Sequence, residues 1–148
     1  MYRNILIATD GSELAGKGLE QGLQLAKAVG ATVTVLTVSE PWIPAVDPYG
    51  YSLADYSEIE TLREATEARG KTILEAAREA AAAIGVPCRT VYEPLVYPAD
   101  AIVKYARDNA IDLIVMASHG RRGVQRVLLG SQATQVLTHS PIPVLIVK

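Results

Sequence analysis

The fold is decided by a short apolar segment that runs directly into a glycine-rich loop, Leu113-Ile114-Val115-Met116-Ala117-Ser118-His119-Gly120-Arg121-Arg122-Gly123. Consecutive apolar residues of this kind are typical of a strand that is buried on both faces of a sheet. Six residues after this stretch, Gly130-Ser131 opens a segment with helical spacing. A strand, glycines and a helix start in this order predict a loop whose backbone N–H groups bind an anion such as phosphate.

The glycines of this loop also have a simpler interpretation. Gly120, Gly123 and Gly130 can be plain turn residues, because glycine adopts positive φ angles at no steric cost. The arginines and the helix-opening serine that accompany them favour the phosphate site over this alternative.

Composition bounds the class of protein before any other motif is considered. The chain has 148 residues, of which 49% are hydrophobic, so we expect a single domain over residues 1–148 that buries its core without disulfides. A net charge of −2 gives no support for a nucleic-acid or anionic-membrane partner. One cysteine, no leading signal segment and no apolar run near ~20 residues predict a soluble protein of the cytoplasm.

Strand and helix patterns alternate along the whole chain. Short β-branched or apolar segments occupy residues 5–8, 33–38, 113–117 and 144–147, with a weaker one at 89–92. Helical spacing is found over 12–29, 57–84, from 98 onward, and from 131 to the residue before Pro141. Ser12 and Gly30 suit the two ends of the first helix. The order predicts an α/β fold with a five-stranded, mostly parallel, doubly wound sheet and helices on both faces.

The helix expected over 57–84 is the longest element of the chain. Its apolar residues predict the side that faces the sheet, namely Ile59, Leu62, Ile73, Ala77, Ala80 and Ile84. In a doubly wound sheet a ligand binds at the carboxyl ends of the strands, where the strand order reverses. We therefore expect the loop Ala8-Thr9-Asp10-Gly11-Ser12 to face the glycine-rich loop across one crevice.

Four separated segments resemble the universal stress protein family. They are residues 5–12, 112–123, 128–131 and 141–147. The ATP-binding branch of that family has the spacing Gly, two residues, Gly, nine residues, Gly and Ser or Thr, which fits Gly120 and Gly130-Ser131. Ala117 stands where the first glycine usually lies, and its methyl group limits how closely a ribose can approach the backbone. The resemblance implies a Rossmann-like fold of the adenine-nucleotide-binding type.

The resemblance also implies a site for ATP with Mg²⁺. Ala8, Asp10 and Ala117 would line the ribose, and the backbone of Val38 would read the adenine edge. Main-chain N–H groups at the loop end and helix start would hold the phosphates. The full set of expected nucleotide-binding residues is Ala8, Thr9, Asp10, Val38, Met116, Ala117, His119, Gly120, Arg122, Gly123, Gly130, Ser131, Gln132 and Ala133. No catalytic residue and no protein ligand for a metal are expected.

Several of these residues have structural alternatives. An ionised Asp10 only accepts hydrogen bonds and suits vicinal hydroxyls, yet it can equally be a turn residue before Gly11. Ser131 can be a phosphate donor or a plain helix N-cap. The arginines at 121, 122 and 126 can pair with phosphates or simply be solvated.

The connection from Ser39 to Tyr56 is longer than most loops of compact domains. Trp42, Tyr49 and Tyr51 give it amphipathic bulk, which fits a lid over the nucleotide or a surface that meets a partner. Disorder is the alternative, and the aromatic content argues against it.

Three functions fit these observations. The first is a nucleotide-dependent regulatory module acting as a homodimer, which the resemblance implies to form through the strand at 144–147. The second is a slow ATPase or another nucleotide-dependent enzyme, although no Gly-x-x-x-x-Gly-Lys-Ser/Thr loop is present. The third is a dimeric scaffold that binds no nucleotide. The retained glycines favour the first.

Overall fold

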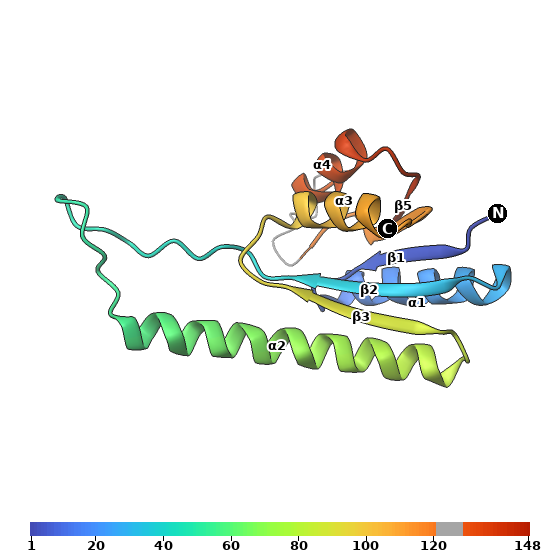
Figure 1. Cartoon of the computed structure of the whole chain (residues 1–148), viewed down its shortest axis with the longest axis horizontal. Coiled ribbons are helices and arrows are strands. Elements are labelled where there is room, and N and C mark those ends of the chain that lie inside the picture. The colour runs from blue at the N-terminus through green and yellow to red at the C-terminus, as the bar shows by residue number, and fades with distance from the viewer. Residues whose placement is uncertain (121–128) are drawn as a thin grey trace.

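The computed structural model describes residues 1–120 and 129–148. Along the chain the elements are β1 (Asn4–Ala8), α1 (Glu13–Val29), β2 (Thr32–Val38), α2 (Tyr56–Ala83), β3 (Cys88–Glu93), α3 (Pro98–Asp108), β4 (Leu113–Ala117), α4 (Ser131–His139) and β5 (Val144–Val147). The strands form one sheet in the order β3-β2-β1-β4-β5, and every pairing of these strands is parallel. The expected α/β, doubly wound fold is confirmed (Figure 1).

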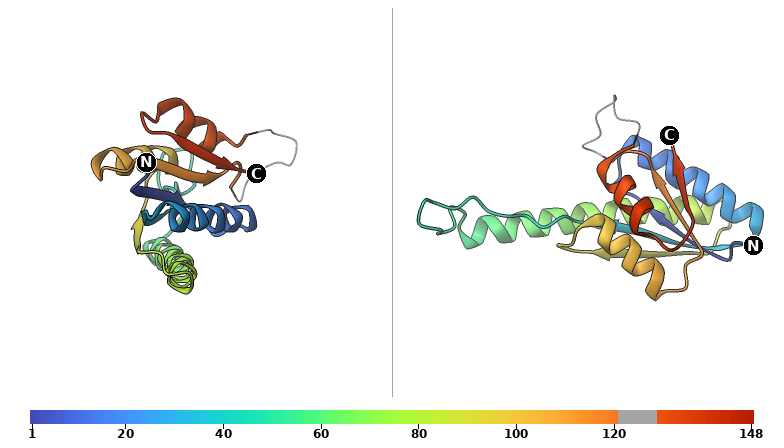
Figure 2. Two further views of the ribbon diagram at one scale, coloured as in Figure 1. Left: turned by 90° about the vertical axis from the view of Figure 1, so that its right-hand side faces the viewer. Right: turned by 90° about the horizontal axis from the view of Figure 1, so that it is seen from above.

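The sheet separates two apolar cores, because successive side chains of a strand point to opposite faces. Ile5 and Ile7 belong to the core under α1 and α2, whereas Leu6 belongs to the core under α3 and α4. All three side chains are fully buried. The helix pairs lie on opposite sides of the sheet (Figure 2), which explains why the central strands read as continuous apolar runs.

Helix α1 packs closely on the two central strands. Its N-cap Ser12 accepts a hydrogen bond from the N–H of Ala15 at 3.2 Å, and Gly30 ends it with a φ of 71°. A Cβ atom on Gly22 would lie 2.6 Å from Cδ1 of the buried Ile7 and 3.3 Å from Cγ1 of Val115. A larger residue at position 22 would therefore push the helix away from β1 and β4.

The apolar side expected for this helix packs on the sheet only in part, with Ala77 buried and Ile84 against the core. Leu74, Ala77 and Ala81 are buried, while Ala80 is exposed and Leu62 keeps 40% of its surface exposed. The reason is length: 28 residues span about 42 Å of helix, far more than the strands below it. Figure 1 shows the first half of α2 extending past the sheet, so its apolar residues there have no sheet to cover.

We expect Gly22→Val to lower the free energy of unfolding by about 1–3 kcal/mol, because the added atoms overpack a filled core. Urea denaturation followed by circular dichroism measures this loss. Gly16→Ala, on the same helix, is the control: its Cβ meets no described atom within 4 Å and alanine favours helix. Equal stability of Gly22→Val and the parent would contradict this packing.

Candidate functional site

The candidate site lies at the carboxyl ends of β1 and β4, where the strand order reverses. Ala8 pairs with Met116 across the two strands, so the loops that follow start side by side. A Cβ atom on Gly120 would lie 2.8 Å from Oδ2 of Asp10. The structure therefore brings the first loop and the start of the glycine-rich loop side by side at this end of the sheet, as the sequence predicts.

Asp10 is a turn residue whose carboxylate lies next to Gly120. Its Oδ1 accepts a hydrogen bond from the N–H of Ser12 at 2.9 Å, and Gly11 follows with a φ of 76°. Its second oxygen, Oδ2, lies where it would meet a Cβ atom added at Gly120. The turn fixes the carboxylate in place, so the two interpretations of Asp10 do not compete.

Gly130 closes the glycine-rich loop onto itself. Its N–H donates to the carbonyl of Ser118 at 2.7 Å. A Cβ at this position would lie 3.0 Å from the same carbonyl oxygen and 3.3 Å from Cα of His119. Its φ is −70°, so a positive φ does not explain this glycine. Close backbone approach explains it instead.

The start of α4 shows which residue caps this helix, and it is not Ser131. Gly130 is the N-cap and Ser131 is the first helical residue, with no side-chain hydrogen bond capping the helix. A plain N-cap role for Ser131 is therefore wrong. Oε1 of Gln132 accepts from the N–H of Ala99 at 3.0 Å, and the side chain of Ala133 is buried, so these two side chains anchor α4 to the fold. Their backbone N–H groups belong to the first turn, whose partial positive charge favours an anion.

His119 contributes a buried nitrogen to the site. Its Nδ1 lies 3.0 Å from Oγ of Ser118, and Ser118 itself is buried. Its Nε2 is buried with no hydrogen-bond partner in the part of the chain that the structure describes. A buried polar nitrogen without a hydrogen-bond partner costs folding free energy unless a ligand or another group supplies that partner. Ser118, which orients the imidazole, was missed at the sequence level because nothing distinguishes it from a loop serine.

The remaining expected residues lie at the ends of the strands around these loops. Thr9, Met116 and Ala117 are more than nine-tenths buried, so little of their side chains is available to a ligand. Val38 ends β2, the strand beside β1, and its side chain packs against the core under α3 and α4. Arg122 and Gly123 lie outside the described residues.

The long connection after β2 does not cover this crevice. It runs away from the sheet alongside the first half of α2 (Figures 1 and 2). The expectation that it is a lid is therefore not met in this structure, and a contact surface remains as the alternative. The connection lies far from the sheet because it leads to the distant end of the long helix α2. No local sequence pattern in the connection itself reveals this distance.

Comparison with known proteins identifies the family. A model of the Universal stress protein family matches residues 1–148. The chain belongs to the universal stress protein family. Universal stress protein YxiE of Bacillus subtilis is 34% identical over 149 residues, which covers all of both chains.

Solved universal stress proteins have the same fold. The structure of MJ0577 of Methanocaldococcus jannaschii superposes with a TM-score of 0.76 at 30% identity, covering 100% of this chain and 96% of that one. A universal stress protein solved in complex with cAMP gives a TM-score of 0.68 at 26% identity, over 99% of this chain and 96% of its own. Within the described residues, no helix has both the length and the apolar character needed to cross a bilayer.

Proposed function

We propose that this universal stress protein binds ATP with Mg²⁺ in the crevice between β1 and β4 and acts as a nucleotide-dependent regulatory module of a cytoplasmic homodimer. The observation that carries the proposal is the meeting of Asp10 with Gly120, beside a loop that Gly130 closes at the start of α4. A carboxylate thus stands opposite backbone donors. The cAMP complex of a relative supports an adenine nucleotide as the ligand.

Each part of the nucleotide has a suitable partner among these residues. The carboxylate of Asp10 accepts from ribose hydroxyls, and the backbone of Val38 meets the adenine. The N–H groups of Gly120, Ser131 and Gln132 suit phosphate oxygens, because the N-terminus of α4 favours negative charge. Nε2 of His119 offers a further polar contact.

The chain's own residues suit binding of Mg²⁺ through the nucleotide rather than through a protein cage. Among the described residues there is no group of three or more His, Cys, Asp or Glu side chains that could hold a metal. Mg²⁺ commonly keeps several waters and binds through phosphates with one or two carboxylates. Asp10 is the carboxylate that lines the crevice, and the cation would neutralise phosphate charge there.

A regulatory role fits better than fast hydrolysis. The nearest approach to a phosphate-loop lysine, Gly70-Lys71-Thr72, lies inside α2, where Nζ of Lys71 pairs with Glu67 at 2.9 Å. The segment 70–72 is therefore part of a helix surface and does not form a phosphate-binding loop. Binding without rapid turnover would let the nucleotide act as a signal that stabilises one state of the protein.

Gly130→Val and Gly120→Ala are both expected to weaken ATP binding at least roughly tenfold, or about 1.4 kcal/mol. The first forces the loop backbone apart at Ser118, and the second displaces the Asp10 carboxylate. Isothermal titration calorimetry measures the affinity, and thermal melting reports whether the fold survives. Gly16→Ala should bind like the parent, whereas parent-like affinity in both site variants would refute the site.

The homodimer is proposed to form through β5. This strand is the last in the sheet order and pairs with β4 on one side. The carbonyls of Pro143 and Val147 accept from the N–H groups of Ile114 on β4 and of Ser118, which follows β4 directly. Because backbone groups of a parallel strand alternate in direction, the N–H of Ile146 faces the outer edge, where a second β5 can pair with it.

Ile146→Pro removes this outward N–H. We expect the parent chain to be a dimer at micromolar concentration and the Ile146→Pro variant to be a monomer of half that mass. Ile146→Val keeps the N–H and is the matched control. Sedimentation velocity measures both, with circular dichroism to verify folding. A parent chain that sediments as a monomer, or an Ile146→Pro variant with the parent's mass, would rule out pairing through β5.

A further inference from the structure

Ser39 directly follows β2 at the carboxyl end of the sheet, and it is only 7% exposed. Its Oγ accepts two hydrogen bonds, one from the hydroxyl of Tyr92 on β3 at 3.0 Å and one from the N–H of Leu95 at 3.1 Å. Removing this buried hydroxyl would leave both donors without their acceptor, which costs free energy. Ser39 is therefore a fixed point between β2 and the segment that follows β3.

The main chain of Ser39 bonds to the same segment. Its N–H donates to the carbonyl of Glu93 at 3.0 Å, and its carbonyl accepts from the N–H of Val96 at 3.1 Å. The backbone and the side chain of this one residue thus make four hydrogen bonds to residues 92–96. We call Ser39 together with residues 92–96 the Ser39 clasp.

The clasp contains a strained residue. Leu95 has a φ of 57°, in the left-handed region that a residue with a Cβ atom rarely adopts. The hydrogen bond from its N–H to Oγ of Ser39 helps to hold it there. Such strain persists where the surrounding contacts over-determine the conformation, and it is concentrated at functional sites. The turn 93–96 is therefore shaped around the hydroxyl of Ser39.

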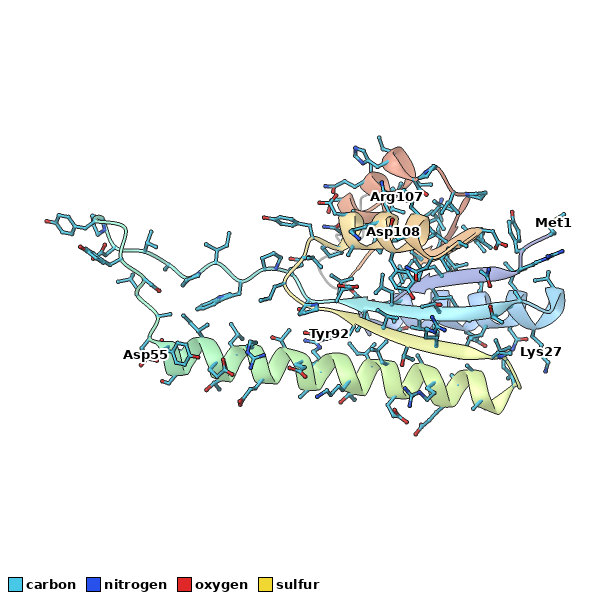
Figure 3. All side chains as sticks on the ribbon, viewed as in Figure 1. Met1, Lys27, Asp55, Tyr92, Arg107 and Asp108 are labelled. Carbon is cyan, nitrogen blue, oxygen red and sulfur yellow. The ribbon has the colours of Figure 1, made fainter. Side chains whose placement is uncertain are left out.

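Helix α2 fixes the tyrosine that bonds to Ser39. A Cβ atom on Gly70 would lie 2.6 Å from Cε2 of Tyr92 and 2.7 Å from its Cδ2, so the ring fills a space that only glycine leaves open. Figure 3 shows Tyr92 between β3 and α2. Because the ring is packed there, its hydroxyl approaches Oγ of Ser39 from a defined position.

The backbone groups of Val38, the last residue of β2, face the end of the sheet where the proposed site lies. β1 pairs with β2 as far as Ala8 beside Leu36, and the N–H of Thr9 donates to the carbonyl of Leu36 at 3.0 Å. Backbone groups of a strand alternate in direction, so the N–H and the C=O of Val38 face the same side as those of Leu36. They therefore point past the end of the β1 pairing, to the side where the loop 9–12 leaves β1.

The peptide bond between Val38 and Ser39 links the clasp to these groups. A peptide group is planar, and its N–H and C=O point in opposite directions. The hydrogen bond from the N–H of Ser39 to Glu93 therefore sets the direction of the C=O of Val38 on the other side of the strand. The hydroxyl of Ser39 keeps Glu93 in place, because it bonds to Tyr92 and Leu95 on either side of it in the chain.

We propose that Ser39 and Tyr92 are positioning residues that make the nucleotide site selective for adenine. The inference rests on the proposed function, in which the backbone of Val38 meets the base. An N–H donor and a C=O acceptor on one residue match adenine, whose ring nitrogen N1 accepts and whose 6-amino group donates. Hypoxanthine has an N1–H donor and a 6-oxo acceptor instead, so the same backbone would set donor against donor and acceptor against acceptor.

The deciding experiment measures the affinities of ATP and of ITP, its hypoxanthine counterpart, by isothermal titration calorimetry with Mg²⁺ present. The parent should bind ATP at least roughly tenfold more tightly than ITP. Tyr92→Phe and Ser39→Ala should each lower this preference by about threefold or more. Their ATP affinity should fall while their ITP affinity, which gains nothing from Val38, stays the same. Tyr105→Phe removes the hydroxyl of another half-buried tyrosine, on α3, and should keep the parent's preference.

The outcomes separate the clasp from the nucleotide site itself. A parent chain that binds neither nucleotide refutes the proposed function, and the role of the clasp with it. If the parent binds ATP and ITP equally, or if both variants keep the parent's preference, the role of Ser39 and Tyr92 is overturned while the nucleotide site stands. Equal losses of ATP and ITP affinity, with a lower melting temperature of the nucleotide-free variants, would mean that the clasp only stabilises the fold, which also overturns the inference.

Discussion

The parallel pairing of β1 with β4 is the constraint on which the rest of the molecule depends. It sets Ala8 beside Met116, and the two chain segments that leave these residues therefore meet as Asp10 and Gly120. The pairing is possible because both strands are buried on both faces and because Gly22 lets α1 lie close against them. The meeting of the two loops is a consequence of the strand order.

Much of this arrangement could be predicted from the sequence because it depends on local patterns. Apolar runs mark the buried strands, and Ser12 and Gly30 mark the ends of α1. The contact of Gly130 with Ser118 could not be predicted from the sequence, since it depends on how the loop closes and not on the φ angle of Gly130 itself. Whether the expected residues bind nucleotide stays a prediction.

The errors in α2 have one physical origin. Helical periodicity shows that a helix has an apolar side, but it does not show where the sheet ends. Leu62 was therefore placed on the apolar side of the helix, and the aromatic residues of the connection were expected to form a lid or a contact surface. The structure leaves these side chains exposed, beyond the edge of the sheet (Figure 1).

The most direct test of the central claim is a titration of ¹⁵N-labelled protein with ATP and Mg²⁺, followed by amide chemical shifts. Binding at the proposed site predicts saturable shifts at Gly11, Gly120 and Ser131, with the amides of Tyr49 and Tyr51, in the connection between β2 and α2, unaffected. Shifts that are absent, or that appear only away from the carboxyl ends of β1 and β4, would contradict it.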